Sequence, residues 1–292
     1  TDVSLYTDYG DKLNTRMTPR QLKTVTTPLT GPREPPFVTP VPLEILDSTN
    51  ANIDNVQLGC SGAECSDPAF VTDTIDYMHG RSGTARFDRR LADIYHASVV
   101  TACRPNMEIP ICSYYKFQED EWDRLQMVYA STNDGVLHAF RANNTTNASQ
   151  TGEEVWGFVP NYLLPRVHQQ IEGGHITNLD LTPTVRDLRL FKGENTAAAD
   201  DKWRTVLVGG YRQGGYGYYA LNVTDPENPE MLWEITQASD DVDTLTDPHD
   251  YENLGLTYGS PFLGTAFIPN PDLAGGPALG EVSVTIFPGG LH

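Results

Sequence analysis

The residues best suited to chemistry in this 292-residue sequence are four cysteines, which fall in two close pairs. Cys60 stands near Cys65 and Cys103 near Cys112, both in loop-like sequence rich in Gly, Ser, Pro and Asn. Thiols in this arrangement could bind zinc, but the spacings are not of the CxxC type and no histidine is suitably paired. We therefore predict two local disulfides, each contributing roughly 2–3 kcal/mol. Such bonds imply an oxidising compartment.

A histidine and an acidic segment are the other candidates for ligand chemistry. His138 alternates with Leu137 and Ala139 in a strand-like pattern, which predicts a hydrogen-bonded structural histidine rather than a ligand. The segment Asp240–Asp250 could offer carboxylates to calcium, but it lacks an EF-hand pattern, and a solvated loop is favoured. No Ser-His-Asp or Cys-His arrangement can be argued from the spacing. We predict no catalytic, cofactor-binding or metal-binding residue, and no enzymatic activity.

A repeated pattern of short strands must position these residues. Met127–Phe140 predicts a hairpin with an Asn-Asp-Gly turn, because Gly135 tolerates the positive φ of a tight turn, and a third strand ends near Trp156. The second copy comprises Arg204–Gly210, Tyr218–Val223 and Met231–Ile235. Short strands that begin with Ser or Thr precede the copies at Ser98–Val100, Thr182–Val185 and Ser260–Leu263.

Four antiparallel strands in each copy, with a Trp on the outer strand, indicate a blade of a β-propeller. The copies begin about eighty residues apart, against roughly forty to forty-five in a compact repeat, so long inter-strand loops must hold the excess. The third copy stops after two strands, which leaves about two and a half blades. We predict an all-β, incomplete propeller, and we expect the chain to be part of a longer polypeptide, because only a closed ring removes exposed sheet edges. Trp156 and Trp233 are predicted to pack between blades.

The charge composition limits the classes of binding partner that the protein can have. The 39 acidic and 20 basic residues give a formal charge of −19, which disfavours nucleic acid and anionic lipid. No apolar run is long enough to cross a membrane. Residues 1–75 lack the repeat and contain the Pro-rich stretch Thr18–Pro42, so we predict an extended N-terminal segment or linker there and the partial propeller over residues 76–292.

Several blocks of the sequence resemble, in order, the C-terminal propeller of PilY-type type IV pilus proteins. The blocks, which lie between about residues 75 and 290, are Ile75–Gly80, Arg90–Ser98, Asn133–Phe140, Glu153–Pro160, Trp203–Gly210, Tyr219–Pro226 and Leu254–Pro261. Departures from the family pattern include Ala92, Ala97 and Val99, where glycine, serine and proline are usual.

The resemblance implies an extracellular protein at the tip of type IV pili, exported through the periplasm. Such a protein sits on minor pilins, supports pilus assembly and adheres to host or abiotic surfaces. The resemblance also makes calcium possible, but the family's calcium loop falls in a later blade and no ligand can be carried over to this sequence.

Two alternatives stay open. A quinoprotein-like propeller enzyme would need a closed eight-bladed ring around a quinone and calcium. A structural subunit would complete a propeller with other chains in a larger extracellular complex, and its isolated form would aggregate through the open edge.

Overall fold

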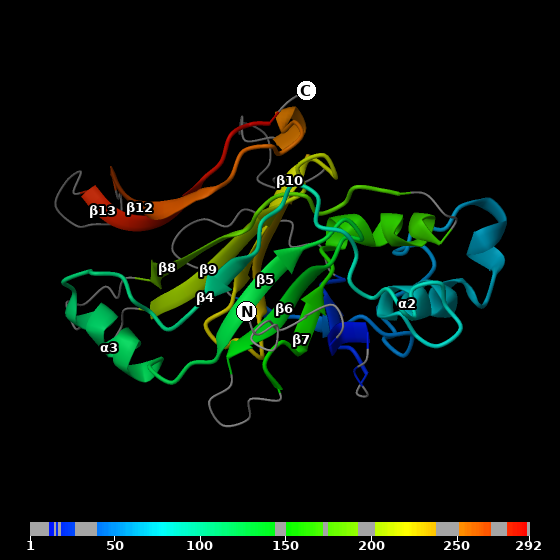
Figure 1. Ribbon diagram of the computed structural model, residues 1–292. Helices are drawn as coiled ribbons and strands as arrows, with labels where there is room; N and C mark the ends of the chain where they lie inside the picture. The colour runs from blue at the N-terminus through cyan, green and yellow to red at the C-terminus, as the bar shows by residue number, and fades with distance from the viewer. Residues whose placement is uncertain are drawn as a thin grey trace.

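The computed structural model describes residues 12–14, 16, 19–26, 40–143, 150–171, 175–191, 202–237, 251–269 and 279–290. Two mainly antiparallel β-sheets form the centre of the molecule, and a two-stranded hairpin lies beside them (Figure 1).

The first sheet contains the first predicted copy of the repeat. Its four antiparallel strands are β4 (Val100–Ala102), β5 (Gln126–Ser131), β6 (Leu137–Asn143) and β7 (Glu154–Phe158). The predicted turn joins β5 to β6: Gly135 has a φ of 86°, and its N–H donates to the carbonyl group of Thr132. The N-terminal segment adds β1 (Leu22–Thr24), which is parallel to β7, and then β3 (Glu44–Ile45).

The second sheet repeats this order of strands. It contains β8 (Thr184–Phe191), β9 (Lys202–Gly210), β10 (Gly217–Asn222) and β11 (Glu230–Thr236), all antiparallel, with β2 (Val41–Pro42) on its outer edge. Strands from residues 1–75 therefore extend both sheets, and the predicted boundary near residue 75 stays a prediction.

The hairpin of β12 (Phe262–Pro269) and β13 (Leu279–Ile286) follows the second sheet. Strand β8 contacts both β4 and β12, so the first strands of the three units are neighbours, as in adjacent propeller blades. Among the described residues the sheets do not close into a ring. The number of blades stays a prediction.

The fold is mostly β rather than all-β, since the described residues also form helices. They are α2 (Phe70–His79), α3 (Cys112–Asp120) and the 3-10 helices η2 (Gly62–Ser66), η4 (Asn161–Gln170) and η6 (Tyr251–Asn253). Ile75 and Met78 place an apolar stripe of α2 in the core, and Gly80, with a φ of 63°, ends the helix. Helices α2 and α3 lie at opposite ends of the sheets in Figure 1. No described helix has the length and apolar character needed to cross a membrane.

The two tryptophans pack between units, as predicted. Trp156 on β7 is fully buried, and its indole N–H donates to the carbonyl group of Pro226, which lies between β10 and β11 of the second sheet, at 2.8 Å. Trp233 on β11 lies against Phe287, which follows β13, with ring centroids 6.4 Å apart. A buried indole contributes a large apolar area, and its N–H fixes the orientation of the ring.

Candidate functional site

His138 lies in a buried ionic centre within the first sheet. Its side chain has no solvent exposure; Nδ1 lies 2.7 Å from Oε1 of Glu154, and Nε2 lies 3.1 Å from Oγ1 of Thr132. Both ring nitrogens therefore have hydrogen-bond partners. This geometry fits the structural histidine that the alternating sequence predicts, and it leaves neither nitrogen available to a ligand.

Glu154 is held by a bidentate ion pair with Arg20. The guanidinium atoms Nε and Nη2 each lie 2.8 Å from a carboxylate oxygen, and both side chains are buried. Burial alone would raise the pKa of Glu154, but the charge and hydrogen bonds of Arg20, with a contribution from His138, hold that pKa far below its ordinary range. The pair fastens the N-terminal segment to β7, and Arg20 also donates to the carbonyl group of Met78 in α2.

Asp134 extends this centre at the hairpin turn. Its carboxylate accepts hydrogen bonds from the guanidinium of Arg86 and the hydroxyl of Thr132. Burial opposes the charge of Asp134, but Arg86 outweighs that effect and lowers the pKa of the carboxyl group. The sequence identified Asp134 only as a turn residue. Its ion pair was not predicted, because the arginine lies 48 residues away in the chain.

The first predicted disulfide is present. Cys60 and Cys65 are bonded, with their Cα atoms 5.1 Å apart. Cys65 lies within η2, so a short helical turn brings the two residues together.

The second predicted disulfide is not formed, since Cys103 and Cys112 are both free and exposed. Cys112 begins α3, whereas the carbonyl group of Cys103 accepts a hydrogen bond from Arg124, just beyond the other end of that helix. Between them the chain runs back along α3, where Gln118 donates to the carbonyl group of Pro105. A nine-residue helix is about 13 Å long, well beyond the 4.4–6.8 Å between Cα atoms that a disulfide requires.

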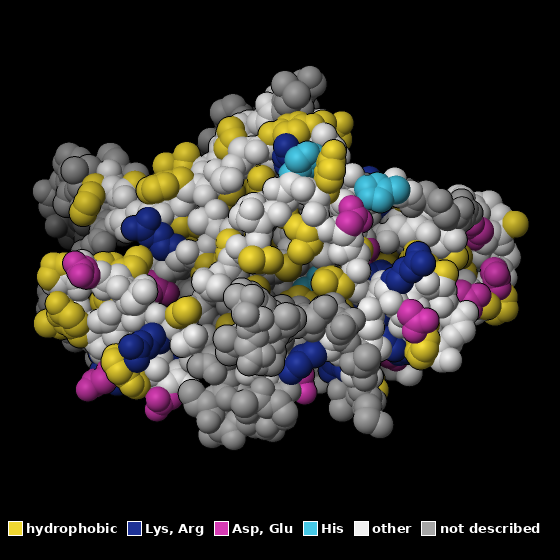
Figure 2. Space-filling view, viewed as in Figure 1, with side chains coloured by type: hydrophobic (Ala, Val, Ile, Leu, Met, Phe, Trp, Pro, Cys, Tyr) yellow, Lys and Arg dark blue, Asp and Glu magenta, His cyan; other side chains and the backbone are white. Residues whose placement is uncertain are grey.

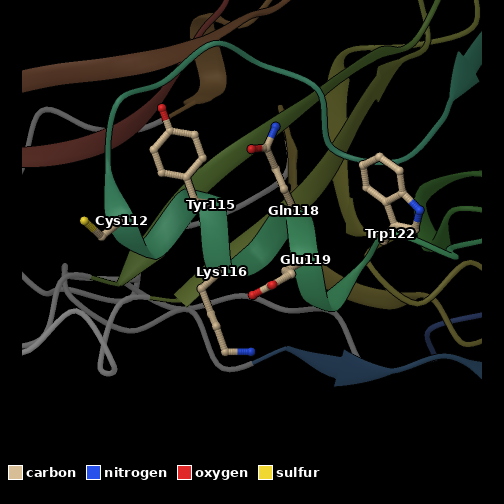
Figure 3. Close-up of a pocket in the computed structure, with 6 residues that line it drawn as sticks. All are labelled: Cys112, Tyr115, Lys116, Gln118, Glu119 and Trp122. Carbon is tan, nitrogen blue, oxygen red and sulfur yellow. The ribbon is translucent and has the colours of Figure 1, made fainter.

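The outer face of α3 forms an open pocket of about 500 Å³ (Figure 3). Tyr115, Gln118 and Trp122 project from the same side of the helix, and Lys116 points away from them. Tyr115 and Trp122 are each 58% exposed. Figure 2 shows hydrophobic side chains gathered at this end of the molecule. Aromatic rings beside amide and charged groups are typical of protein contact surfaces.

The inner face of α3 packs against the second sheet. Tyr114 is buried against Trp203 of β9, with ring centroids 4.7 Å apart, and its hydroxyl donates to Asp187 of β8. The indole N–H of Trp203 donates to the hydroxyl of Ser113. The helix is thereby fixed to the second sheet.

A further cluster lies in the loops around the first strands of the sheets. The buried carboxylate of Asp180 binds Nδ1 of His96 at 2.6 Å and Nη1 of Arg212 at 2.8 Å. Figure 2 shows histidine side chains near basic and acidic ones on this face. Arg212 has a φ of 55° and lies over the ring of Tyr258. The cluster joins three loops into one surface.

No group of three or more His, Cys, Asp and Glu side chains in the described part of the chain is arranged to hold a metal ion. The acidic segment Asp240–Asp250 lies outside the described residues.

The four antiparallel strands repeated in each of the two sheets, with their first strands as neighbours, are arranged as in adjacent blades of a protein of the β-propeller class. Residues 91–270 match the family model described as the PilY1 beta-propeller domain. The match covers more than half of the chain, so the chain belongs to the PilY1 β-propeller family.

Relatives carry the same family name. Over 160 residues the chain is 36% identical to a type IV pilus biogenesis factor PilY1 homolog of Xylella fastidiosa, which covers 52% of this chain and 10% of that protein. Over 202 residues it is 30% identical to the type IV pilus biogenesis factor PilY1 of Pseudomonas aeruginosa, covering 64% of this chain and 15% of that one. The matched region thus spans only a small part of these relatives.

The crystal structure of the Pseudomonas aeruginosa PilY1 C-terminal domain is also similar. It aligns with a TM-score of 0.44 at 25% identity, covering 65% of this chain and 31% of that structure.

Proposed function

We propose that this chain is the propeller part of a non-enzymatic protein that supports type IV pilus assembly from the pilus tip. The family match over residues 91–270 carries the proposal, and the relatives named type IV pilus biogenesis factors support it. In this proposal the protein is exported through the periplasm to the outer cell surface, contacts minor pilins and adheres to host or abiotic surfaces. The Cys60–Cys65 disulfide is compatible with that oxidising route.

The outer face of α3 is the proposed contact surface. Its aromatic side chains are exposed, yet the helix beneath them is fixed to β8 and β9, so binding there needs little reordering. Rigid, exposed aromatic anchors are the residues that most often carry binding energy in protein interfaces.

The location is tested by immunogold labelling of sheared surface filaments with an antibody to residues 127–160. Label confined to filament ends supports the proposed location. Label absent from filaments, together with a soluble protein that absorbs like a quinone, would refute it in favour of the propeller-enzyme alternative.

The contact surface is tested by piliation of cells that carry the double substitution Tyr115→Ala and Trp122→Ala. We expect fewer surface pili at an unchanged level of the protein. Val56→Ala is the matched control, because Val56 is 74% exposed but lies outside α3. Normal piliation and adhesion in the double variant would remove α3 from the proposal.

Calcium binding is a separate part of the proposal. It is tested by measuring the unfolding temperature of the purified protein at increasing calcium concentrations. We expect a rise with calcium that magnesium does not reproduce, since calcium accepts more oxygen ligands in flexible geometry. An unchanged unfolding temperature would remove calcium from the proposal.

A further inference from the structure

A second pocket, at the C-terminal end of α2, is lined by basic side chains. It has a volume of about 310 Å³, and the described residues that line it are Arg16, Pro19, Arg20, His79, Gly80, Arg81, Ser82 and Arg90. Four arginines line it, in a chain whose formal charge is −19. No carboxylate is among these described lining residues.

The carboxylates that pair with these arginines belong to residues outside the lining. Glu154 binds Arg20 from within the first sheet, and Asp47 and Asp76 bind Arg81. Glu154 also binds Arg16, with 3.4 Å between Nη1 of Arg16 and Oε2 of Glu154, so it serves two of the arginines. Three of the four arginines are therefore ion-paired with acids that do not line the pocket.

Arg90 is held in a different way. Its Nε and Nη1 atoms donate to three backbone carbonyl groups, those of Gly80, Leu13 and Asn14. These bonds fix the guanidinium without neutralising its charge. Asp88 is a nearby carboxylate that offsets part of that charge. The hydroxyl of Ser82 stands on the same lining, on an exposed residue.

Burial and neighbouring arginines act on two of the lining side chains, whereas the carboxylates bound to Arg20 and Arg81 raise the pKa of those two arginines. Burial lowers the pKa of Arg90, and the charge of Arg20 lowers it further. Burial likewise lowers the pKa of His79 to about 4, and Arg20 and Arg81 add to this effect. His79 is therefore neutral near pH 7, because a further positive charge is disfavoured at this point.

We propose that this arginine pocket binds an oxyanion of the phosphate class, either a free ion or the phosphoryl group of a small molecule. Guanidinium groups match the geometry of phosphate and donate parallel hydrogen bonds to two of its oxygens. Arg16 and Arg20 belong to the N-terminal segment, Arg81 is the second residue after α2, and Arg90 follows in the next loop. A multiply charged tetrahedral ion can therefore be contacted from several sides. The bound ion would join these segments. The site is independent of the pilus function proposed above.

The test is isothermal titration calorimetry of the purified protein with inorganic phosphate at low ionic strength. We expect saturable binding, and a dissociation constant that rises at least about ten-fold in Ser82→Glu and in Arg90→Gln. Ser82→Glu places a carboxylate at the pocket from an exposed position, so the fold is kept even if Arg90→Gln destabilises the chain. Arg89→Gln is the matched control, because Arg89 is exposed and does not line the pocket.

Two further titrations distinguish the sources of the anion. Glucose 6-phosphate binding more tightly than phosphate would identify a phosphorylated small molecule, and equal affinities would identify the free ion; glucose itself should not bind. The proposal is overturned if phosphate shows no saturable binding up to about 10 mM. It is equally overturned if Ser82→Glu and Arg89→Gln bind phosphate with the same affinity as the unchanged protein.

Discussion

Replacing Glu154 with Gln removes the negative charge that holds Arg20 in the centre of the first sheet. Gln has nearly the same shape, so packing around the β7 side chain is kept. It offers only one oxygen to the two donors of Arg20. Its amide NH2 group takes the place of the other carboxylate oxygen and faces an N–H donor of Arg20. The buried guanidinium is left without a compensating charge.

The expected loss is about 3–5 kcal/mol in the free energy of unfolding, the cost of breaking a buried ion pair by removing one partner. That is a large fraction of the roughly 5–15 kcal/mol that stabilises a typical domain. Both side chains are almost completely buried, so solvent does not screen the interaction.

The pH dependence is a second signature. The native pKa of Glu154 lies far below the ordinary value of 4.5, so its stabilising contribution is complete above that value and is lost as pH falls toward the native pKa. The difference in unfolding free energy between the unchanged protein and Glu154→Gln should therefore be constant from about pH 7 to pH 5 and shrink below about pH 4.5.

The assay is urea unfolding followed by tryptophan fluorescence, since Trp156 is buried on the same strand. Glu153→Gln is the control, because Glu153 is the exposed neighbour in the sequence. A loss of less than about 1 kcal/mol relative to Glu153→Gln would refute the argument, since it would lie within the range of exposed ion pairs.

Three further outcomes are expected. The native pKa of His79, about 4 against an ordinary 6.5, means that stability falls as pH drops from 6.5 toward 4; in His79→Gln urea unfolding over this range should show a smaller decline, and an equal decline would contradict the assignment. Trp156→Phe should lower the free energy of unfolding by about 1–2 kcal/mol, because it removes a buried hydrogen bond between the sheets, whereas Trp122→Phe should change it by less than about 0.5 kcal/mol; equal effects would show that the indole hydrogen bond adds nothing. Thiol titration of the native, unreduced protein should label both Cys103 and Cys112, and an absence of reaction would favour the disulfide that their spacing suggests.

The strands were predictable because their signals are local. The turn at Gly135 needs a residue that tolerates a positive φ, and glycine does so. The strand through His138 shows the side-chain alternation with a period of two that marks any strand. The addition of β1 to the first sheet and of β2 to the second was not predictable, since the pairing partners of such short strands lie far away in the sequence.

The helices show a different limit. Helix α2 carries an apolar stripe and ends at Gly80, yet no helix was predicted from this stretch of the sequence. Helix α3 has no capping side chain, and packing of Tyr114 against Trp203 stabilises it instead. The same helix separates Cys103 from Cys112, and sequence spacing alone could not show this.

The order of strands, the hairpin turn, the acidic charge and the family could all be inferred from the amino-acid sequence. These properties depend on residue type and local spacing, which a single chain displays directly. The fold determines that Glu154 rather than Glu153 pairs with Arg20, and that four arginines line one pocket at the end of α2. The physical reason is that Arg20 and Glu154 are 134 residues apart, and a buried charge finds its partner through packing rather than through sequence.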